Sequence, residues 1–209
     1  LGAEHYSGVT RVVTAKDVTG QRKQGTIYKD WPLFIAEGEI THFIGDILAA
    51  VVANDVRTAR RGVEQINLTY EILPAVFDPE EALNPHAPQV HADHVNLLSN
   101  SIIKRGDVDS ALKGSVFVET RTFETQMVEH AFLEPESSIA FLNDGIIEVL
   151  SQGQGVFDDR KQIASFLGVP EEKVTVKLIS NGGAFGGKED LSIQGQVALM
   201  AMLTNTPVK

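Results

Sequence analysis

In the first half of the chain, the order of apolar and polar positions predicts strands on either side of a helix. Valines at 9–13 indicate an early strand, and the almost wholly apolar run 45–54 is typical of a strand that is buried on both faces. Asp55 follows at an N-cap position, and apolar residues then recur at helical spacing over 56–66. Alternation over 68–72 predicts a further strand. The last three elements predict a β-α-β unit, for which a right-handed crossover is the usual connection.

The second half of the chain alternates between strand-like and helix-like patterns. Asp144-Gly145 supplies the positive φ angles of a tight turn, which predicts a hairpin between 138–142 and 146–150. A helical pattern ends at Gly168, a residue type common after the last turn of a helix. The other elements predicted here are a short helix or turn at 106–112, a long strand at 116–126, a helix at 159–167, a strand at 173–179, a glycine-rich loop at 180–187 and a helix at 190–203.

A polar, proline-rich stretch joins the two halves. Residues 78–100 contain Pro79, Pro85 and Pro88, which is a composition typical of a linker or a surface loop. We therefore expect an α+β fold with two domains. Their expected boundaries are residues 1–82 for the first domain, 83–104 for the linker and 105–209 for the second domain.

Charge and composition narrow the classes of function. The formal net charge is −10, so nucleic acid is not an expected partner, because binding to phosphates needs a basic surface. The chain has no cysteine, which excludes disulfides and cysteine-bound zinc or iron–sulfur clusters and fits a cytoplasmic location. Its apolar runs are too short to cross a bilayer. Because the chain has no cysteine to bind an iron–sulfur cluster, any redox centre is organic or held by another chain.

The most informative stretch is glycine-rich and lies between a predicted strand and a predicted helix. It holds four glycines in the six positions 182–187, so its backbone can approach a ligand closely, and N–H groups at a helix start favour an anion. The P-loop pattern G-x-x-x-x-G-K-[ST] fits from Gly182 through Lys188, but Glu189 stands where the magnesium-binding hydroxyl should be. ATP hydrolysis is not expected for that reason. A tight turn with no ligand is the other interpretation of such a glycine cluster.

Two groups of histidines are candidates for metal ligands and have simpler interpretations. Glu129 and His130 are expected to form a buried, hydrogen-bonded structural pair. His86, His91 and His94 lie with Asp93 in the proline-rich stretch, without helical or strand spacing to bring them together. We therefore expect a solvated linker there and assign no metal ligand in the chain.

Four segments resemble the large subunit of the xanthine dehydrogenase and aldehyde oxidase family, in the order expected for it. GGAFGGKE at 182–189 resembles the cofactor loop, and SQGQ at 151–154 with ASFLGVPEEKVTV at 164–176 resembles the glutamine loop with its helix and strand. VEHAFLEPESS at 128–138 resembles the start of the molybdenum domain, and residues 45–76 resemble the small α+β hammerhead domain. The resemblance implies a hammerhead domain followed by the first part of a mixed α+β molybdenum-cofactor-binding domain.

The resemblance also implies roles for individual residues. Counting back from Gly168-Val169-Pro170, Gln154 matches the glutamine that hydrogen-bonds an oxo group on molybdenum, and an amide N–H₂ suits an anionic metal–oxo centre. Gln152, two residues away, is a competing assignment, and a solvated loop glutamine is the alternative. The segment whose backbone meets the pterin dithiolene, with an aromatic side chain that excludes water, is matched by Gly183, Ala184, Phe185 and Gly186. A core phenylalanine is the alternative for Phe185.

Glu189 matches a position that varies with the class of substrate. Members of the family that act on purines resemble this sequence in carrying glutamate there, where it can hydrogen-bond the heterocycle. The resemblance therefore implies a purine or related N-heterocycle, with an aldehyde as the other class. A carboxylate that is favoured by the dipole at a helix N-terminus is an equally weighted interpretation of Glu189.

The family reaction hydroxylates a carbon next to a ring nitrogen, or an aldehyde carbon, with water as the oxygen source. The resemblance implies a molybdenum cofactor, molybdopterin either alone or as its cytosine dinucleotide, with iron–sulfur clusters and FAD in partner domains or subunits. The general-base glutamate of the family is expected outside these 209 residues. We therefore expect a fragment, or one chain of a split enzyme, that needs the remaining molybdenum-domain polypeptide and shows no turnover alone. A non-catalytic assembly module, supplying half of the pocket to a partner, is the alternative.

Overall fold

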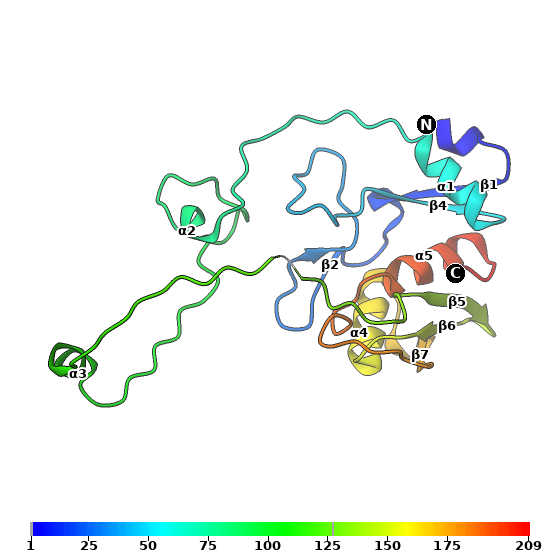
Figure 1. The fold of residues 1–209 in the computed structure, drawn as a ribbon. Coiled ribbons are helices and arrows are strands. Elements are labelled where there is room, and N and C mark those ends of the chain that lie inside the picture. The colour runs from blue at the N-terminus through cyan, green and yellow to red at the C-terminus, as the bar shows by residue number, and fades with distance from the viewer. Residues whose placement is uncertain (1, 127) are drawn as a thin grey trace. The chain divides into compact units, whose positions relative to one another are not determined.

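The computed structural model describes residues 2–126 and 128–209, and the chain divides into two compact units (Figure 1). The first unit combines the residues up to Thr69 with His130–Lys209, and the second unit is Tyr70–Glu129. Every strand among the described residues belongs to the first unit. The candidate site also lies in the first unit, so that unit is described in more detail.

A three-stranded sheet with two helices forms the centre of the first unit. The strand order is β5-β6-β7, with β5 and β6 antiparallel and β6 and β7 parallel. Side chains of β6 are buried alternately, which is the pattern of a sheet with one covered face, and α4 and α5 pack against the sheet. The bounds of these elements are β5 Ser138–Asn143, β6 Ile146–Ser151, α4 Val156–Leu167, β7 Val174–Leu178 and α5 Gln194–Thr204.

Turn residues end these elements as the sequence predicts. Asp144 and Gly145 have φ angles of 49° and 76°, and they connect the β5–β6 hairpin. Gly168 ends α4 in the left-handed conformation, with a φ of 67°. The connection β6-α4-β7 is a β-α-β unit with parallel strands. The predicted hairpin, helix and following strand are therefore confirmed, although α4 begins three residues earlier than predicted.

The residues before Thr69 form an antiparallel strand pair with one helix. β1 (Val9–Thr14) pairs with β4 (Ala49–Ala53), and Asp55 caps α1 (Val56–Glu64) by accepting a hydrogen bond from the backbone N–H of Thr58. The predicted strand at 68–72 does not form. Its alternating side chains are exposed and meet no strand edge within the described chain. The predicted β-α-β unit in this half is therefore wrong, because the helix is not followed by a pairing strand.

Shorter elements connect these parts. β2 and β3 form an antiparallel pair, and 3-10 turns precede β1, follow β1 and precede β7. Their bounds are η1 Gly2–His5, η2 Ala15–Asp17, β2 Lys23–Gln24, β3 Trp31–Pro32 and η3 Glu171–Lys173.

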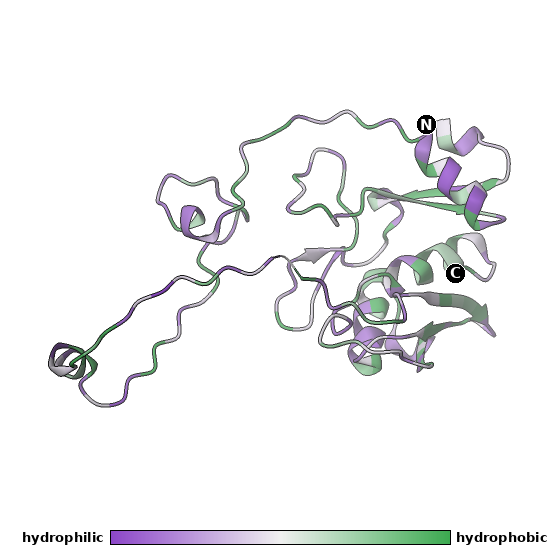
Figure 2. Ribbon diagram, viewed as in Figure 1, coloured by the Kyte–Doolittle hydropathy of each residue, from purple (hydrophilic) through white to green (hydrophobic). Residues whose placement is uncertain are grey.

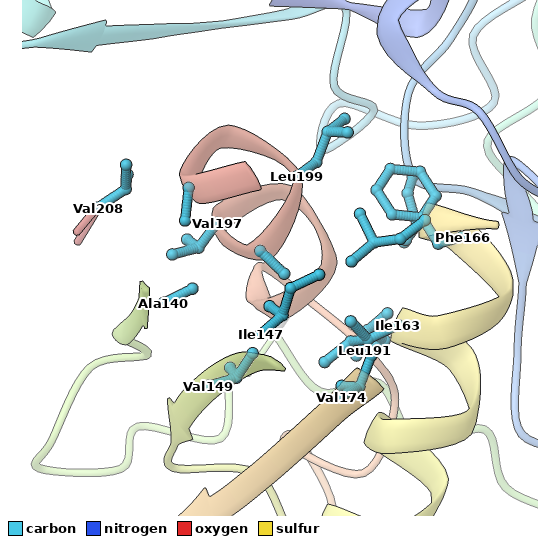
Figure 3. Packing of buried hydrophobic residues seen from close by; sticks show 14 of the residues in the cluster. Ala140, Ile147, Val149, Ile163, Phe166, Val174, Leu191, Val197, Leu199 and Val208 are labelled. Atoms are coloured by element: carbon cyan, nitrogen blue, oxygen red, sulfur yellow. The ribbon is translucent and has the colours of Figure 1, made fainter. Parts of the chain in front are cut away.

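One hydrophobic core runs through both parts of the first unit. Phe34 stacks on Phe166 of α4 with ring centroids 6.4 Å apart, and the amide nitrogen of Gln196 in α5 donates to the carbonyl of Leu33 at 3.0 Å. Core side chains surround α5 and fill the space between it, the sheet and α4 (Figure 3). They include Ala140, Ile147, Val149, Ile163, Phe166, Val174, Leu191, Val197, Leu199 and Val208. The N-terminal residues are therefore part of the support for the two helices.

The segment Thr19–Gln21 closes the C-terminal end of α4. The last carbonyls of a helix have no partner within the helix. Here the backbone N–H groups of Gly20 and Gln21 donate to Phe166 and Ser165 at 3.1 and 2.9 Å, and the Thr19 hydroxyl donates to Leu167 at 2.6 Å. A chain segment from the N-terminal part thereby takes the place of water at this helix end.

The second unit has little regular structure. It contains α2 (Pro79–Ala82) and α3 (Val108–Gly114), and Asp107 caps α3 at the position where a short helix or turn is predicted. The predicted strand at 116–126 is wrong, since these residues form neither helix nor strand and their apolar side chains are exposed. A strand needs a partner edge for its backbone, and the described part of the chain offers it none. Apolar residues accordingly lie along extended segments in Figure 2.

We expect Gly20→Ala to lower the free energy of unfolding by about 2 kcal/mol or more. A Cβ at Gly20 would lie 2.0 Å from the carbonyl oxygen of Ser165 and 2.4 Å from the backbone nitrogen of Gly168, so backbone would have to move. Gly114→Ala is the matched control, because a Cβ there meets nothing within 4 Å. Urea unfolding measures both. Equal stability of the two variants would contradict this account of the α4 end.

Candidate functional site

Two loops of the first unit meet at the ends of parallel strands. Residues 152–155 follow β6 and lead into α4, and residues 179–187 follow β7. Because β6 and β7 are parallel neighbours, both loops leave the sheet at the same edge. The side chain of Asn181 links them, since its nitrogen donates to the carbonyl of Gln152 at 2.9 Å. The topology therefore brings together the two segments that the sequence singles out.

Gln154 is fixed by hydrogen bonds across these two loops. Its side-chain oxygen accepts from the backbone N–H groups of Gly186 at 3.1 Å and Lys188 at 3.3 Å, and its own backbone N–H donates to the Lys188 carbonyl at 2.8 Å. The residue is exposed, and its amide N–H₂ donates to no other described residue. The side chain is therefore oriented through its oxygen, while its donor group is left for an outside acceptor.

Gln152 is held in a different way. It is 5% exposed, and its side-chain oxygen accepts from the backbone N–H of Ser137 at 3.0 Å and from the Ser137 hydroxyl at 3.3 Å. This geometry joins the glutamine loop to the start of β5. Of the two candidate glutamines, only Gln154 presents its amide at the surface, which favours Gln154 for contact with a ligand.

The glycine-rich loop adopts conformations that few residues other than glycine take. Gly183 and Gly186 have φ angles of 109° and 86°, and Phe185 between them has a φ of 52°, which is uncommon for an aromatic residue. The Phe185 side chain is 72% exposed, so the alternative of a core phenylalanine is wrong for the described chain. Strained residues of this kind often lie at ligand sites.

Most N–H groups of this loop already have partners. Gly182 donates to the Glu134 carboxylate at 2.7 Å, and Gly183 donates to the Asn181 side chain at 3.0 Å. Gly186 and Gly187 bond to Gln154 and to the Ala184 carbonyl. Within the described segment 182–188, the backbone N–H groups without a partner are those of Ala184 and Phe185, and the side-chain N–H₂ of Gln154 is also without one. These donors, beside an exposed aromatic ring, fit a group that presents anionic oxygens.

Lys188 is buried beneath the loop. It is 1% exposed, and its ammonium donates to the carbonyl of Glu134 at 2.9 Å and lies 4.3 Å from the centre of the Phe132 ring. A P-loop lysine must reach the phosphates of a nucleotide, and this one is turned into the protein instead. α5 also begins six residues after Lys188 rather than directly after the glycines. The P-loop interpretation is therefore contradicted by the structure.

Glu189 lies outside any helix. The predicted helix at 190–203 begins only at Gln194. The residues before it are held in another conformation, because the Gln194 side-chain oxygen accepts from the N–H groups of Ser192 and Ile193 at 3.0 Å each. The Thr26 hydroxyl also donates to Asp190 at 2.9 Å. The dipole of a helix acts within its first turn. The interpretation of Glu189 as a helix N-terminal carboxylate is therefore wrong. The prediction that a helix starts directly after the glycine loop, with its first N–H groups at the site, is wrong as well. Its side chain is exposed.

Comparison with known proteins identifies the fold to which these loops belong. The family model described as the molybdopterin cofactor-binding domain matches residues 90–209, and the model described as the aldehyde oxidase and xanthine dehydrogenase a/b hammerhead domain matches residues 2–74. The chain belongs to the aldehyde oxidase and xanthine dehydrogenase family. The resemblance and the α+β fold inferred from the sequence are thereby confirmed.

Relatives in this family are larger than the chain. A probable xanthine dehydrogenase subunit of Bacillus subtilis (strain 168) is 35% identical over 100% of the chain, which spans 28% of that protein. The nicotinate dehydrogenase large molybdopterin subunit of Eubacterium barkeri is 32% identical over 99% of the chain, which spans 48% of it. The structure of the aldehyde oxidoreductase from Desulfovibrio gigas superposes with a TM-score of 0.85 at 26% identity, covering 99% of this chain and 24% of that one.

Histidines of the chain do not gather into a metal site within the described residues. Among the residues that the structure describes, no group of three His, Cys, Asp or Glu side chains could hold a metal ion. Glu129 and His130 are exposed, so the predicted buried pair is wrong on burial. The His130 ring instead packs close to the glycine loop, since a Cβ at Gly187 would lie 2.7 Å from its Nδ1.

Among the described residues, no helix combines the length and apolar character that a membrane span requires.

Several residues that support the family's cofactor loops are not identified by sequence reasoning. Glu134 holds a loop N–H group from a segment distant in sequence, and nothing local indicates that Lys188 is buried. Asn181 accepts from the N–H of Gly183 two residues on, which is a local turn contact that Asn often makes. Asp159 is different, because it precedes Ile163 and Phe166 at helical spacing and so lies on the apolar face of α4. A carboxylate in that position is a signal of a buried polar contact.

We expect Lys188→Met to lower the free energy of unfolding by about 1–3 kcal/mol, because the part-buried carbonyl of Glu134 loses its donor while the volume is kept. Lys161→Met is the matched control, since Lys161 is exposed and its ammonium forms a surface ion pair with Asp158 at 3.5 Å. It should change stability by less than about 0.5 kcal/mol. Chemical denaturation distinguishes the two, and a neutral Lys188→Met would show that the ammonium is not part of the loop's support.

Proposed function

We propose that this chain is the hammerhead part and the first cofactor-binding part of a molybdenum hydroxylase that acts on a purine or related N-heterocycle. The domains expected at 1–82 and 105–209, with a linker at 83–104, are part of this proposal. The cofactor supplies the redox chemistry, with water as the oxygen donor. The residues of this chain bind and orient that cofactor.

The geometry of Gln154 is the observation that carries the proposal. Its side-chain oxygen is engaged by two backbone N–H groups of the glycine loop, so its N–H₂ projects as an oriented donor. A preoriented donor stabilises negative charge on an oxygen without having to reorganise. Gln154 would therefore hold an oxygen of the metal group in place, and Gln152 would support the loop from below.

The glycine loop would form a wall of the same pocket. Gly183, Ala184 and Gly186 would let the backbone come close to the pterin, because glycine has no Cβ and the side chain of alanine is small. Phe185, exposed in the described chain, would cover the cofactor and keep water from it. The free N–H groups of Ala184 and Phe185 would add donors at this wall.

Glu189 is the residue that we assign to the substrate. Its carboxylate is exposed directly after the cofactor loop, and helix formation does not account for it. A carboxylate can accept hydrogen bonds from ring N–H groups of a heterocycle. The names of two relatives, xanthine dehydrogenase and nicotinate dehydrogenase, refer to N-heterocyclic substrates, and this supports the same class here.

The proposal includes partners and a location. The general-base glutamate would come from the remaining molybdenum-domain polypeptide, and iron–sulfur and flavin subunits or domains would carry the electrons away. Two of the relatives are themselves named as subunits. The cofactor would be molybdopterin, alone or as the cytosine dinucleotide, and the assembly would be cytoplasmic.

Metal and pterin analysis of the complete protein, purified from its native host together with its partners, tests the proposal. Molybdenum and a pterin in roughly equal amounts, with an iron–sulfur partner, is the expected result. A protein that purifies with its partners but without molybdenum or pterin would contradict the proposal and favour the alternative of a non-catalytic assembly module.

We expect Gln154→Glu to lower kcat/KM about 100-fold in the complete holoenzyme, which is the scale for loss of one preoriented donor. The change keeps the shape and the accepting oxygen and replaces the donating N–H₂ with a charged oxygen. Gln21→Glu, at another exposed glutamine, controls for the added charge and should leave kcat/KM unchanged. Steady-state kinetics with equal molybdenum loading measures this, and similar values for both variants would contradict the role of Gln154.

We expect Glu189→Ala to change the ratio of kcat/KM between two classes of substrate, rather than to lower kcat/KM equally for both. Loss of its hydrogen bond should lower kcat/KM for a purine by about tenfold or more, while an aromatic aldehyde, which lacks ring N–H groups, should be affected far less. Glu172→Ala, at an exposed glutamate of η3, is the control. An equal loss for both substrates would argue against a contact between Glu189 and the heterocycle.

A further inference from the structure

A buried polar network lies directly under the glutamine loop. Asp159 in the first turn of α4 is 0% exposed, and among the described residues its Oδ1 has no hydrogen-bond partner. Its backbone N–H donates to the carbonyl of Gly155 at 2.8 Å. A Cβ at Gly153 would lie 2.7 Å from Asp159 Oδ2, so the loop backbone passes close over this carboxyl group.

Ser151 connects the carboxyl group to the loop. Its Oγ accepts from the backbone N–H of Gly153 at 3.0 Å and from the side-chain nitrogen of Gln194 at 3.3 Å. A hydroxyl has two acceptor positions and one proton, so the proton is left for Asp159 Oδ2 at 3.4 Å. Each hydrogen-bonding position of Ser151 is therefore used, and the direction of each bond is fixed.

Gln194 carries the network to the segment that follows the glycine loop. Its nitrogen donates to Ser151, and its oxygen accepts from the N–H groups of Ser192 and Ile193. The same side chain thus fixes the start of α5 and contacts the end of β6. One continuous chain of hydrogen bonds runs from Asp159 through Ser151 to both segments that flank the candidate site.

We propose that Asp159 is a positioning residue for the glutamine loop, which acts through the Ser151 hydroxyl to hold the backbone that carries Gln154. This inference rests on the proposed function, which supplies the reason for positioning Gln154. The hydrogen-bonded link between Asp159 and the glutamine loop is a property of this chain whatever its function. Nothing in the reaction requires Asp159 to touch the cofactor or the substrate. Its effect on the site passes through Gly153 and Ser151.

Burial gives this position a distinctive response to pH. The pKa of Asp159 is raised from 3.8 to about 7, and loss of hydration is the main cause. The hydrogen bond from the Ser151 hydroxyl lowers the pKa, and the negative charge of Asp158 raises it. The groups facing Asp159 from β6 and α5, Ser151 and Gln194, are uncharged. Charged side chains of the other elements packed against α4 do not contribute to the shift; these are Lys23, Glu171, Glu172, Lys173 and Lys177.

The sign of the effect follows from linkage between protonation and opening. A carboxyl group whose pKa is higher in the closed loop than in an opened, hydrated loop favours the closed state most strongly below pH 4. That contribution declines as the pH rises from about 4 to about 7, and is lost above it. If loop opening hydrates Asp159, protection of the loop amides from exchange must fall over the same range.

Hydrogen exchange of the complete protein, followed by mass spectrometry at pH 5, 6, 7 and 8 and corrected for the intrinsic pH dependence, tests the proposal. We expect peptides covering 152–155 to lose protection by about tenfold or more between pH 5 and pH 7 and to change little above pH 8. Asp159→Asn, which cannot ionise, should abolish this dependence. Asp158→Asn, at the exposed neighbour, should keep it with a slightly lower midpoint, because burial is the larger cause of the shift.

Ser151→Ala separates coupling from titration. It removes the link but leaves the carboxyl group in place. The exchange protection of the loop peptides should therefore lose its dependence on pH, while the free energy of global unfolding should still depend on pH. The same pH dependence of loop protection in wild type and Asp159→Asn would overturn the proposal, as would an unchanged response in Ser151→Ala. Molybdenum and pterin content of the same wild-type sample is a separate readout, so failure of the proposed function would be recognised independently of the exchange result.

Discussion

The contact between Gln154 and the glycine loop is the interaction on which the candidate site depends. Three hydrogen bonds tie Gln154 to Gly186 and Lys188, and two of them use the side-chain oxygen as the acceptor. A solvated loop glutamine loses rotamer freedom only when such bonds compensate for it. Here the compensation comes from N–H groups of the opposite loop. Each loop is therefore part of the other's support.

The surrounding protein makes that contact possible by holding both loops from beneath. Parallel pairing of β6 and β7 places the loops at one sheet edge. Lys188 and Glu134 then fasten the glycine loop, and Ser151, Asp159 and Gln194 fasten the glutamine loop. The N-terminal residues contribute as well, since the Thr19–Gln21 segment closes α4 and Phe34 packs on it. The hammerhead part therefore contributes to the support of the cofactor loops.

Local patterns in the sequence predict the parts of this fold that local forces determine. The Asp144-Gly145 hairpin, the Asp55 cap and the Gly168 helix end depend on neighbouring residues, and each forms as predicted. The strands predicted at 68–72 and 116–126 have the right alternation, but a strand also needs a partner edge, which a single-sequence pattern cannot supply. The late start of α5 is determined by the Gln194 side chain, which a propensity argument does not detect.

Of the candidate site too, only some residues could be found from the sequence. Gln154 and the loop at 183–186 are found by resemblance, and the structure gives physical grounds for preferring Gln154 to Gln152, namely burial and the direction of hydrogen bonds. The supporting residues Glu134 and Lys188 are distant in sequence from their partners, so no local spacing reveals them. Asn181 has one local contact, with Gly183, but its link to Gln152 crosses to the other loop. Asp159 could be suspected from its place on an apolar helix face, although its partners could not.

An experimental structure of the complete protein with its cofactor tests the central claim most directly. The account predicts that the Gln154 side-chain nitrogen lies within about 3 Å of an oxygen of the metal group, while its oxygen still accepts from Gly186 and Lys188. It also predicts that Phe185 lies against the cofactor. A structure in which Gln152 faces the metal, or in which Gln154 has left the glycine loop, would contradict the account.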